Sequence, residues 1–236
     1  SNKAARIPEK HSETAFMTNR AIEFIEESKD KPWFLHLSYI KPHWPYMAPA
    51  PYHNMYSQNE FYPVHRNDAE KNNDHPVYKA FMENSISKTF SKDEVRNTVL
   101  SGYMGLIKQI DDNLGRLFKF LEDTGHMDDT MIIFTSDHGD YQGDHWLGEK
   151  ELFHEQSVRV PMIIYDPSEH ADNTRGTKEK RFIEAIDLLP TFLDAVESPV
   201  SKHRLEGNSL MPIIKGDNPK TWKDFVFSEI DYSFNE

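Results

Sequence analysis

MIIFTSDHGDYQGDHWLGEK, residues 131–150, is the stretch that decides the expected fold of this chain. It begins with four apolar residues, 131–134, which have the length and composition of a buried strand. Asp137 and His138 follow after two polar residues, so a carboxylate and an imidazole are expected where this strand ends. Open α/β sheets place their ligands at the carboxyl ends of strands. The stretch therefore predicts an α/β fold with a divalent-metal site suited to ester chemistry.

The rest of the chain alternates between helical and strand patterns. Apolar residues at helical spacing predict helices over residues 11–29, 91–125, 188–196 and 208–215. The second is expected to start with a capping box of Ser91 and Glu94, and the third to have Asp187 as its N-cap. Short apolar runs predict further strands over residues 33–40, 158–165, 182–186 and 224–229. We expect one α/β domain over residues 1–236, without an internal boundary.

Two loops differ from this alternation. Residues 41–56 contain His43 among four prolines, and this stiff segment is expected to hold the imidazole in place. Residues 61–91 show no clear periodicity, so we expect an irregular surface segment that covers a site or meets a neighbouring subunit. A homo-oligomer is therefore left open.

Composition excludes several classes of protein. The net charge of −12 argues against nucleic acid as a partner, because phosphates require a basic surface. The absence of cysteine excludes thiolate metal sites and a cysteine nucleophile within these 236 residues. No long apolar run or targeting segment is present, so no membrane partner is expected, and location is left open between cytoplasm and periplasm. Ser1–Asn2 resemble the remnant of a cleaved tag, and we expect the chain to begin within a longer protein.

Several motifs now carry a resemblance to a known family. TSDHGDYQGDHWLGEK (135–150), followed by SVRVP (157–161), resembles the second metal-ligand motif of sulfatases in the alkaline phosphatase superfamily. KPHWPYMAPAPYHNMY (41–56) is more similar to the phosphonate monoester hydrolases of that group. IDDNLG (110–115) and DLLPTFLDAV (187–196) match the same family, in the expected order. The resemblance covers most of the chain. It implies a mixed, mainly parallel sheet flanked by helices, and hydrolysis of small sulfate, phosphonate or phosphate esters.

The resemblance also implies roles for four residues. Asp137 matches a metal-binding carboxylate, and His138 the adjacent ligand, which is Asn in many sulfatases. This donor pair suits Ca²⁺, Mg²⁺, Mn²⁺ or Zn²⁺. His43 matches a histidine that touches the substrate oxygens or leaving group, and Lys150 a lysine that binds the anionic ester. The plain structural alternatives are a turn-forming aspartate, a packed loop histidine and a solvated lysine.

Other polar residues are expected to be structural. His145 is expected to make a structural hydrogen bond, with a supporting contact to the metal loop as the alternative. Asp111 and Asp112 are expected on a solvated helix face. Arg159 is expected to pair with a neighbouring carboxylate.

The chain departs from the family pattern in two places. The family nucleophile is a formylglycine made from Cys or Ser in a Cys/Ser-x-Pro/Ala-x-Arg motif, and this sequence contains no such motif. The first pair of metal-binding aspartates is also missing. We therefore expect the carboxyl-terminal portion of a sulfatase-like catalytic domain, inactive by itself, with the nucleophile in an upstream segment. The alternatives are a non-catalytic metal- or anion-binding module and a phosphodiesterase or phosphomutase relative.

Overall fold

The computed structural model describes residues 3–28, 31–57, 61–198 and 204–231, so Ser1–Asn2 lie outside the described residues. The chain forms two compact units. The first contains residues Ser1–Met127 and His138–Val160, and the second contains Asp128–Asp137 and Pro161–Glu236. The expectation of one domain over residues 1–236 stays a prediction.

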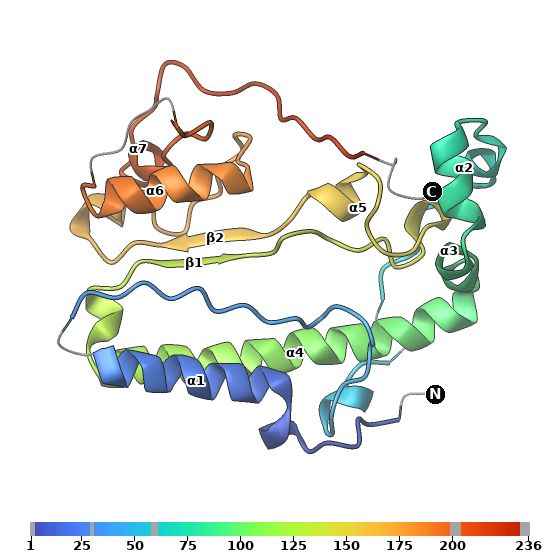
Figure 1. Ribbon diagram of the computed structural model, residues 1–236, viewed down its shortest axis with the longest axis horizontal. Helices are drawn as coiled ribbons and strands as arrows, with labels where there is room; N and C mark the ends of the chain where they lie inside the picture. Colours follow the sequence, from blue (N-terminus) through green and yellow to red (C-terminus); the bar gives the residue numbers. More distant parts are fainter. Residues whose placement is uncertain (1–2, 29–30, 58–60, 199–203, 232–236) are drawn as a thin grey trace. The chain divides into compact units, whose positions relative to one another are not determined.

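Two helices form the centre of the first unit. Helix α1 (Glu13–Ser28) lies alongside the long helix α4 (Asp93–Asp123), as Figure 1 shows. Both were predicted, because their apolar residues recur at helical spacing and face inward. The buried apolar residues of the two helices are Ala15, Ala21, Ile25, Leu106, Ile110, Leu117 and Leu121.

The predicted start of α4 is wrong. Lys92 is the N-cap and contributes no side-chain cap, so Ser91 and Glu94 form no capping box. Ser91 instead ends the preceding helix α3 (Ser85–Phe90), and its hydroxyl donates to the carbonyl of Ser87 at 2.8 Å. A serine can cap either end of a helix, and here the helix before it uses the hydroxyl.

The prediction of an irregular segment over residues 61–91 is also wrong. It contains the 3-10 helix Asp68–Asn72, helix α2 (Pro76–Glu83) and α3. Pro76 stands in the first turn of α2, where its missing N–H costs no hydrogen bond. The Asn84 side chain accepts from the N–H of Ser87 at 2.7 Å and so caps α3. These helices are too short to show a clear apolar period.

The second unit contains the strand pair of the described residues. Strand β1 (Ile132–Thr135) pairs with β2 (Met162–Tyr165) in an antiparallel register, with Ile132 opposite Tyr165. Both strands were predicted, although residues 155–158 form helix α5 (Glu155–Val158) of the first unit, so the second strand starts later than expected. The two short helices α6 (Leu188–Ala195) and α7 (Met211–Ile214) confirm their predictions.

Asp187 stands at the N-cap of α6, but its side chain makes no cap hydrogen bond. Its carboxylate instead accepts from the N–H groups of Glu184 and Asn208, both at 2.8 Å, and from the ammonium of Lys223 at 2.9 Å. The residue therefore joins three segments of the second unit.

Three predicted strands are absent from the described residues: 33–40, 182–186 and 224–229. A strand requires ladder hydrogen bonds to a partner strand, and among the described residues β1 and β2 are the pair that forms one. Their apolar side chains stay largely outside a core, with Phe34 67% exposed and Phe227 74% exposed. Among the described residues, no helix is long and apolar enough to cross a membrane.

Candidate functional site

The loop that carries His43 lies directly on helix α4, because two glycines of that helix allow backbone contact. A Cβ atom at Gly102 would lie 2.5 Å from the carbonyl oxygen of Tyr46. A Cβ atom at Gly105 would lie 2.3 Å from the carbonyl oxygen of Tyr52. Both distances are below any normal contact, so only glycine fits at these positions. The peptide bonds before Pro42, Pro45 and Pro51 in this loop are cis.

The His43 ring contacts Lys150, which is 107 residues away in the sequence. Its Nδ1 lies 3.0 Å from the carbonyl oxygen of Trp44, and because a carbonyl only accepts, Nδ1 carries the proton. The lone pair is then on Nε2, which lies 3.2 Å from Nζ of Lys150. The Lys150 ammonium therefore donates to the His43 imidazole.

His138 lies next to this pair. The centroid of its ring is 6.1 Å from that of His43, in an edge-to-face arrangement. Its Nδ1 lies 2.7 Å from the carbonyl oxygen of Gly139 and donates to it. The proton on Nδ1 leaves the Nε2 lone pair, which is the tautomer that a metal-binding imidazole needs. The first unit thus brings together three predicted site residues: His43, His138 and Lys150.

Helix α5 fixes the backbone around this cluster. The N–H of Gly139 donates to the carbonyl of Ser157 at 2.7 Å, and the Ser157 hydroxyl donates to the carbonyl of Lys150. A Cβ atom at Gly139 would lie 2.0 Å from the carbonyl oxygen of Gln156, so no side chain fits there. One short helix therefore holds the segments on both sides of the loop 139–150.

Asp137 belongs to the second unit and is joined to His138 by a peptide bond. The hydroxyl of Ser136 lies 3.4 Å from its carboxylate. A carboxylate and an imidazole are donor types that fit a divalent cation. Within the described ranges, however, no three His, Asp or Glu side chains gather closely enough to hold one. The doublet would thus supply two of the roughly six donors that such cations take.

The residues expected to be structural have the expected surroundings. The Nδ1 atom of His145 lies 3.0 Å from a carboxylate oxygen of Glu70, and its ring stacks on that of His154 with centroids 4.1 Å apart. Asp111 and Asp112 pair with Lys108 on the surface of α4, and Arg159 pairs with Glu155 at 3.1 Å.

Sequence reasoning missed one pair beside the cluster. The hydroxyl of Tyr46 donates to Asp140 Oδ2 at 2.7 Å. Burial raises the pKa of Asp140, and burial followed by the charge of Asp140 raises the pKa of Tyr46. The two residues are 94 positions apart and share no motif spacing, so only their closeness to His43 and His138 in sequence could have drawn attention to them.

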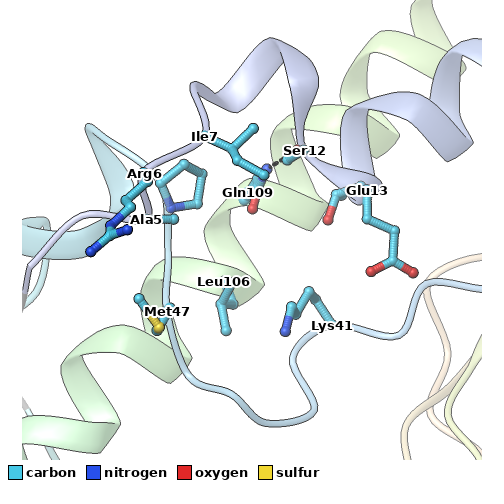
Figure 2. A pocket seen from close by; sticks show the side chains of 11 residues that line it. Ala5, Arg6, Ile7, Ser12, Glu13, Lys41, Met47, Leu106 and Gln109 are labelled. Atoms are coloured by element: carbon cyan, nitrogen blue, oxygen red, sulfur yellow. Dashed lines mark hydrogen bonds between the residues drawn. The ribbon is translucent and has the colours of Figure 1, made fainter.

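A cavity of about 360 Å³ is lined in part by residues of the same loop, as Figure 2 shows. The side chains of Lys41, Met47 and Leu106 line it, and a hydrogen bond of 2.7 Å from Gln109 to Ser12 closes one wall. The Lys41 ammonium donates to the carbonyls of His43 at 3.3 Å and Pro45 at 3.1 Å. Neither His43, Lys150 nor His138 lines this cavity.

The family follows from comparison with known proteins. The sulfatase family model matches residues 2–198, so the chain belongs to the sulfatase family. The predicted resemblance to sulfatases and phosphonate monoester hydrolases of the alkaline phosphatase superfamily is thereby confirmed.

Two relatives and one solved structure place the chain within that family. It is 36% identical to the multifunctional alkaline phosphatase superfamily protein PehA of Trinickia caryophylli, over 98% of this chain and 47% of PehA. It is 32% identical to an arylsulfatase of Clostridium perfringens, over 94% of this chain and 45% of that enzyme. The crystal structure of the phosphonate monoester hydrolase of Agrobacterium radiobacter matches with a TM-score of 0.87 and 32% identity, over 98% of this chain and 49% of that one.

These matches confirm the alkaline-phosphatase-like α/β fold class, here as a partial domain. The chain spans about half the length of the curated relatives it matches.

Proposed function

We propose that this chain supplies part of the active site of a metal-dependent hydrolase of sulfate or phosphonate monoesters. The observation that carries the proposal is the 3.2 Å contact between Lys150 Nζ and His43 Nε2, beside the His138 ring. Three motif residues from distant parts of the sequence converge at one place, which plain structural roles do not require. The names of the relatives, an arylsulfatase and a phosphonate monoester hydrolase, support this class of substrate.

Lys150 and His43 act on the ester group in this proposal. The Lys150 ammonium donates to a non-bridging oxygen of the bound ester and stabilises the charge that grows there in the transition state. His43, with its Nε2 lone pair facing Lys150, takes up a proton and donates it to the leaving-group oxygen. Both side chains lie on segments held by backbone contacts, so they are placed before the substrate arrives.

Asp137 and His138 would hold the divalent cation, which is Ca²⁺, Mg²⁺, Mn²⁺ or Zn²⁺. When bound, the cation polarises the ester and neutralises part of its charge. The remaining ligands and a formylglycine nucleophile belong to parts of a longer protein that these 236 residues do not contain. The isolated chain is therefore inactive and binds metal weakly.

The test is an activity panel on the complete protein with metals varied. Aryl sulfate, phosphonate monoester and phosphodiester substrates are compared after chelation and after adding back each metal. We expect turnover of a sulfate or phosphonate monoester that is lost with chelator and restored by metal. Asp137→Ala should lower kcat/KM by on the order of 10³, because it removes a charged metal ligand.

Other outcomes contradict the proposal. Metal binding without turnover of any ester would indicate a non-catalytic binding module. Turnover of phosphodiesters alone would indicate a phosphodiesterase relative with a serine or threonine nucleophile. Activity of Asp137→Ala within about threefold of the parent would exclude the metal assignment.

A further inference from the structure

A side-chain hydrogen bond besides the Lys150–His43 contact joins the segment that carries His43 to the segment that carries His138. Tyr46 lies three residues after His43, and Asp140 lies two residues after His138. The Tyr46 hydroxyl donates to Asp140 Oδ2 at 2.7 Å. Burial and the neighbouring carboxylate both raise the pKa of Tyr46, so its phenol stays a protonated donor. Hydrogen bonds from a neutral donor to a carboxylate are stronger than those between neutral groups.

Both partners of this hydrogen bond are fixed by other contacts. The second oxygen of Asp140 accepts from the backbone N–H of Gln142 at 3.0 Å. The Tyr46 ring packs edge-on against the rings of Phe90 and Tyr103, with centroids 6.1 and 6.0 Å away. The hydrogen bond therefore fixes the two segments relative to each other, because neither side chain can rotate away without losing further contacts.

Short connections lead from this bond to the catalytic groups. On one side, the Lys41 ammonium binds the carbonyls of His43 and Pro45, which keeps the turn between His43 and Tyr46 closed. On the other side, the N–H of Tyr141 donates to the carbonyl of Glu149 at 2.8 Å, one residue before Lys150.

We propose that Tyr46 is a positioning residue, whose hydrogen bond to Asp140 sets the contact between His43 Nε2 and Lys150 Nζ. The expected effect on turnover rests on the hydrolase function proposed above. The effect on the geometry can be tested without turnover. A tyrosine that only fills space would tolerate loss of its hydroxyl.

Tyr46→Phe in the complete protein tests this directly, because it removes one hydroxyl and keeps the ring. Tyr103→Phe is the matched control: Tyr103 packs on the same ring, and its hydroxyl donates to no other described residue. The first readout is carbethoxylation of His43 by diethyl pyrocarbonate, followed by mass spectrometry. This reagent attacks the unprotonated imidazole nitrogen, which here accepts from Lys150, and exposed His36 serves as the internal reference.

We expect Tyr46→Phe to raise the rate of His43 modification about threefold or more relative to His36, and Tyr103→Phe to leave it unchanged. In the turnover assay, Tyr46→Phe should lower kcat roughly tenfold with KM little changed, since the leaving-group step depends on His43. An unchanged His43 rate in Tyr46→Phe, or equal effects of the two variants, would overturn the positioning role. Absence of turnover in the parent protein would count against the hydrolase function and leave the His43 readout to decide the positioning role.

Discussion

Lys150 is the residue whose role depends most on the fold, because it lies thirteen positions after Asp137 in the sequence. Its ammonium could have been an ordinary solvated charge. The structure instead places it 3.2 Å from His43 Nε2, with its backbone carbonyl bound by Ser157. A lysine whose backbone carbonyl and ammonium group are both hydrogen-bonded has lost much of its conformational entropy before any substrate binds. This favours a binding role.

We predict that Lys150→Ala lowers kcat/KM for an anionic ester by roughly 10–100-fold in the complete protein. The loss follows from removing the charge that neutralises the ester oxygens. Lys119→Ala is the control, since Lys119 is an exposed lysine on α4 that pairs with Asp123. Steady-state kinetics of the two variants measure the difference. Equal kinetics for both would show that Lys150 is an ordinary surface charge.

At this scale the motif residues could be predicted from the sequence, and the contacts between them could not. His43, His138 and Lys150 stand in recognisable motifs, and the structure brings them together. The hydrogen bond between Tyr46 and Asp140 depends on the packing of two segments 94 residues apart. No local spacing encodes such a contact, because it is set by how the loop rests on α4.

Helix α4 is the element on which the His43 loop rests, and its glycines differ in what surrounds them. A Cβ atom at Gly102 would meet the Tyr46 carbonyl oxygen at 2.5 Å, whereas one at Gly115 would meet nothing within 4 Å. Gly102 lets the His43 loop pack against α4, whereas Gly115 only lowers the stability of the helix.

We predict opposite effects on stability for alanine at these two positions. Gly102→Ala should lower the free energy of unfolding by about 1–3 kcal/mol, since the collision with backbone outweighs the gain in helix propensity. Gly115→Ala should raise it by up to about 1 kcal/mol. Urea denaturation of the complete protein measures both. A Gly102→Ala variant as stable as Gly115→Ala would mean that the loop does not press on the helix.

The loop between β1 and α5 contains a second element-scale feature, the stacked rings of His145 and His154. Burial, and then the charge of His145, lower the pKa of His154. The groups that face this pair are Glu70, His65, Tyr78 and Tyr141. Glu70 opposes the shift but is the smallest of its causes. A histidine with a lowered pKa is neutral in the folded state and resists protonation.

We predict that stability falls as the pH drops below about 6.5, the ordinary pKa of histidine, toward the lower value of folded His154. The unfolded chain binds the proton more readily there, so acid favours unfolding, and this contribution is fully present above pH 6.5. Thermal unfolding across pH 5–8 measures the effect. His154→Phe should flatten the profile, with exposed His36→Phe as control. A profile unchanged by His154→Phe would remove this residue as a source of acid sensitivity.

Helices were easier to predict than strands, for a physical reason. The apolar period of α1 and α4 is a local property, because a helix satisfies its own backbone hydrogen bonds. Residues 33–40 have a strand-like composition, but a strand also needs a partner strand, and the sheet of the described residues consists of β1 and β2. The helices α2 and α3 were missed because one or two turns carry too little pattern to recognise.

At the scale of the whole molecule, the chain is a partial domain of the alkaline-phosphatase-like fold. It matches relatives over nearly its entire length but covers about half of theirs. The missing nucleophile motif and first aspartate pair agree with a site that other residues complete. Asp137 ends a segment of the second unit, and His138 begins a segment of the first.

Anomalous X-ray diffraction from crystals of the complete protein, recorded at the absorption edge of its bound metal, tests the central claim most directly. We predict an anomalous peak within coordination distance of both the Asp137 carboxylate and the His138 Nε2 atom, with the side chains of Lys150 and His43 facing that ion. An ion bound elsewhere, with this doublet turned into ordinary packing, would contradict the account.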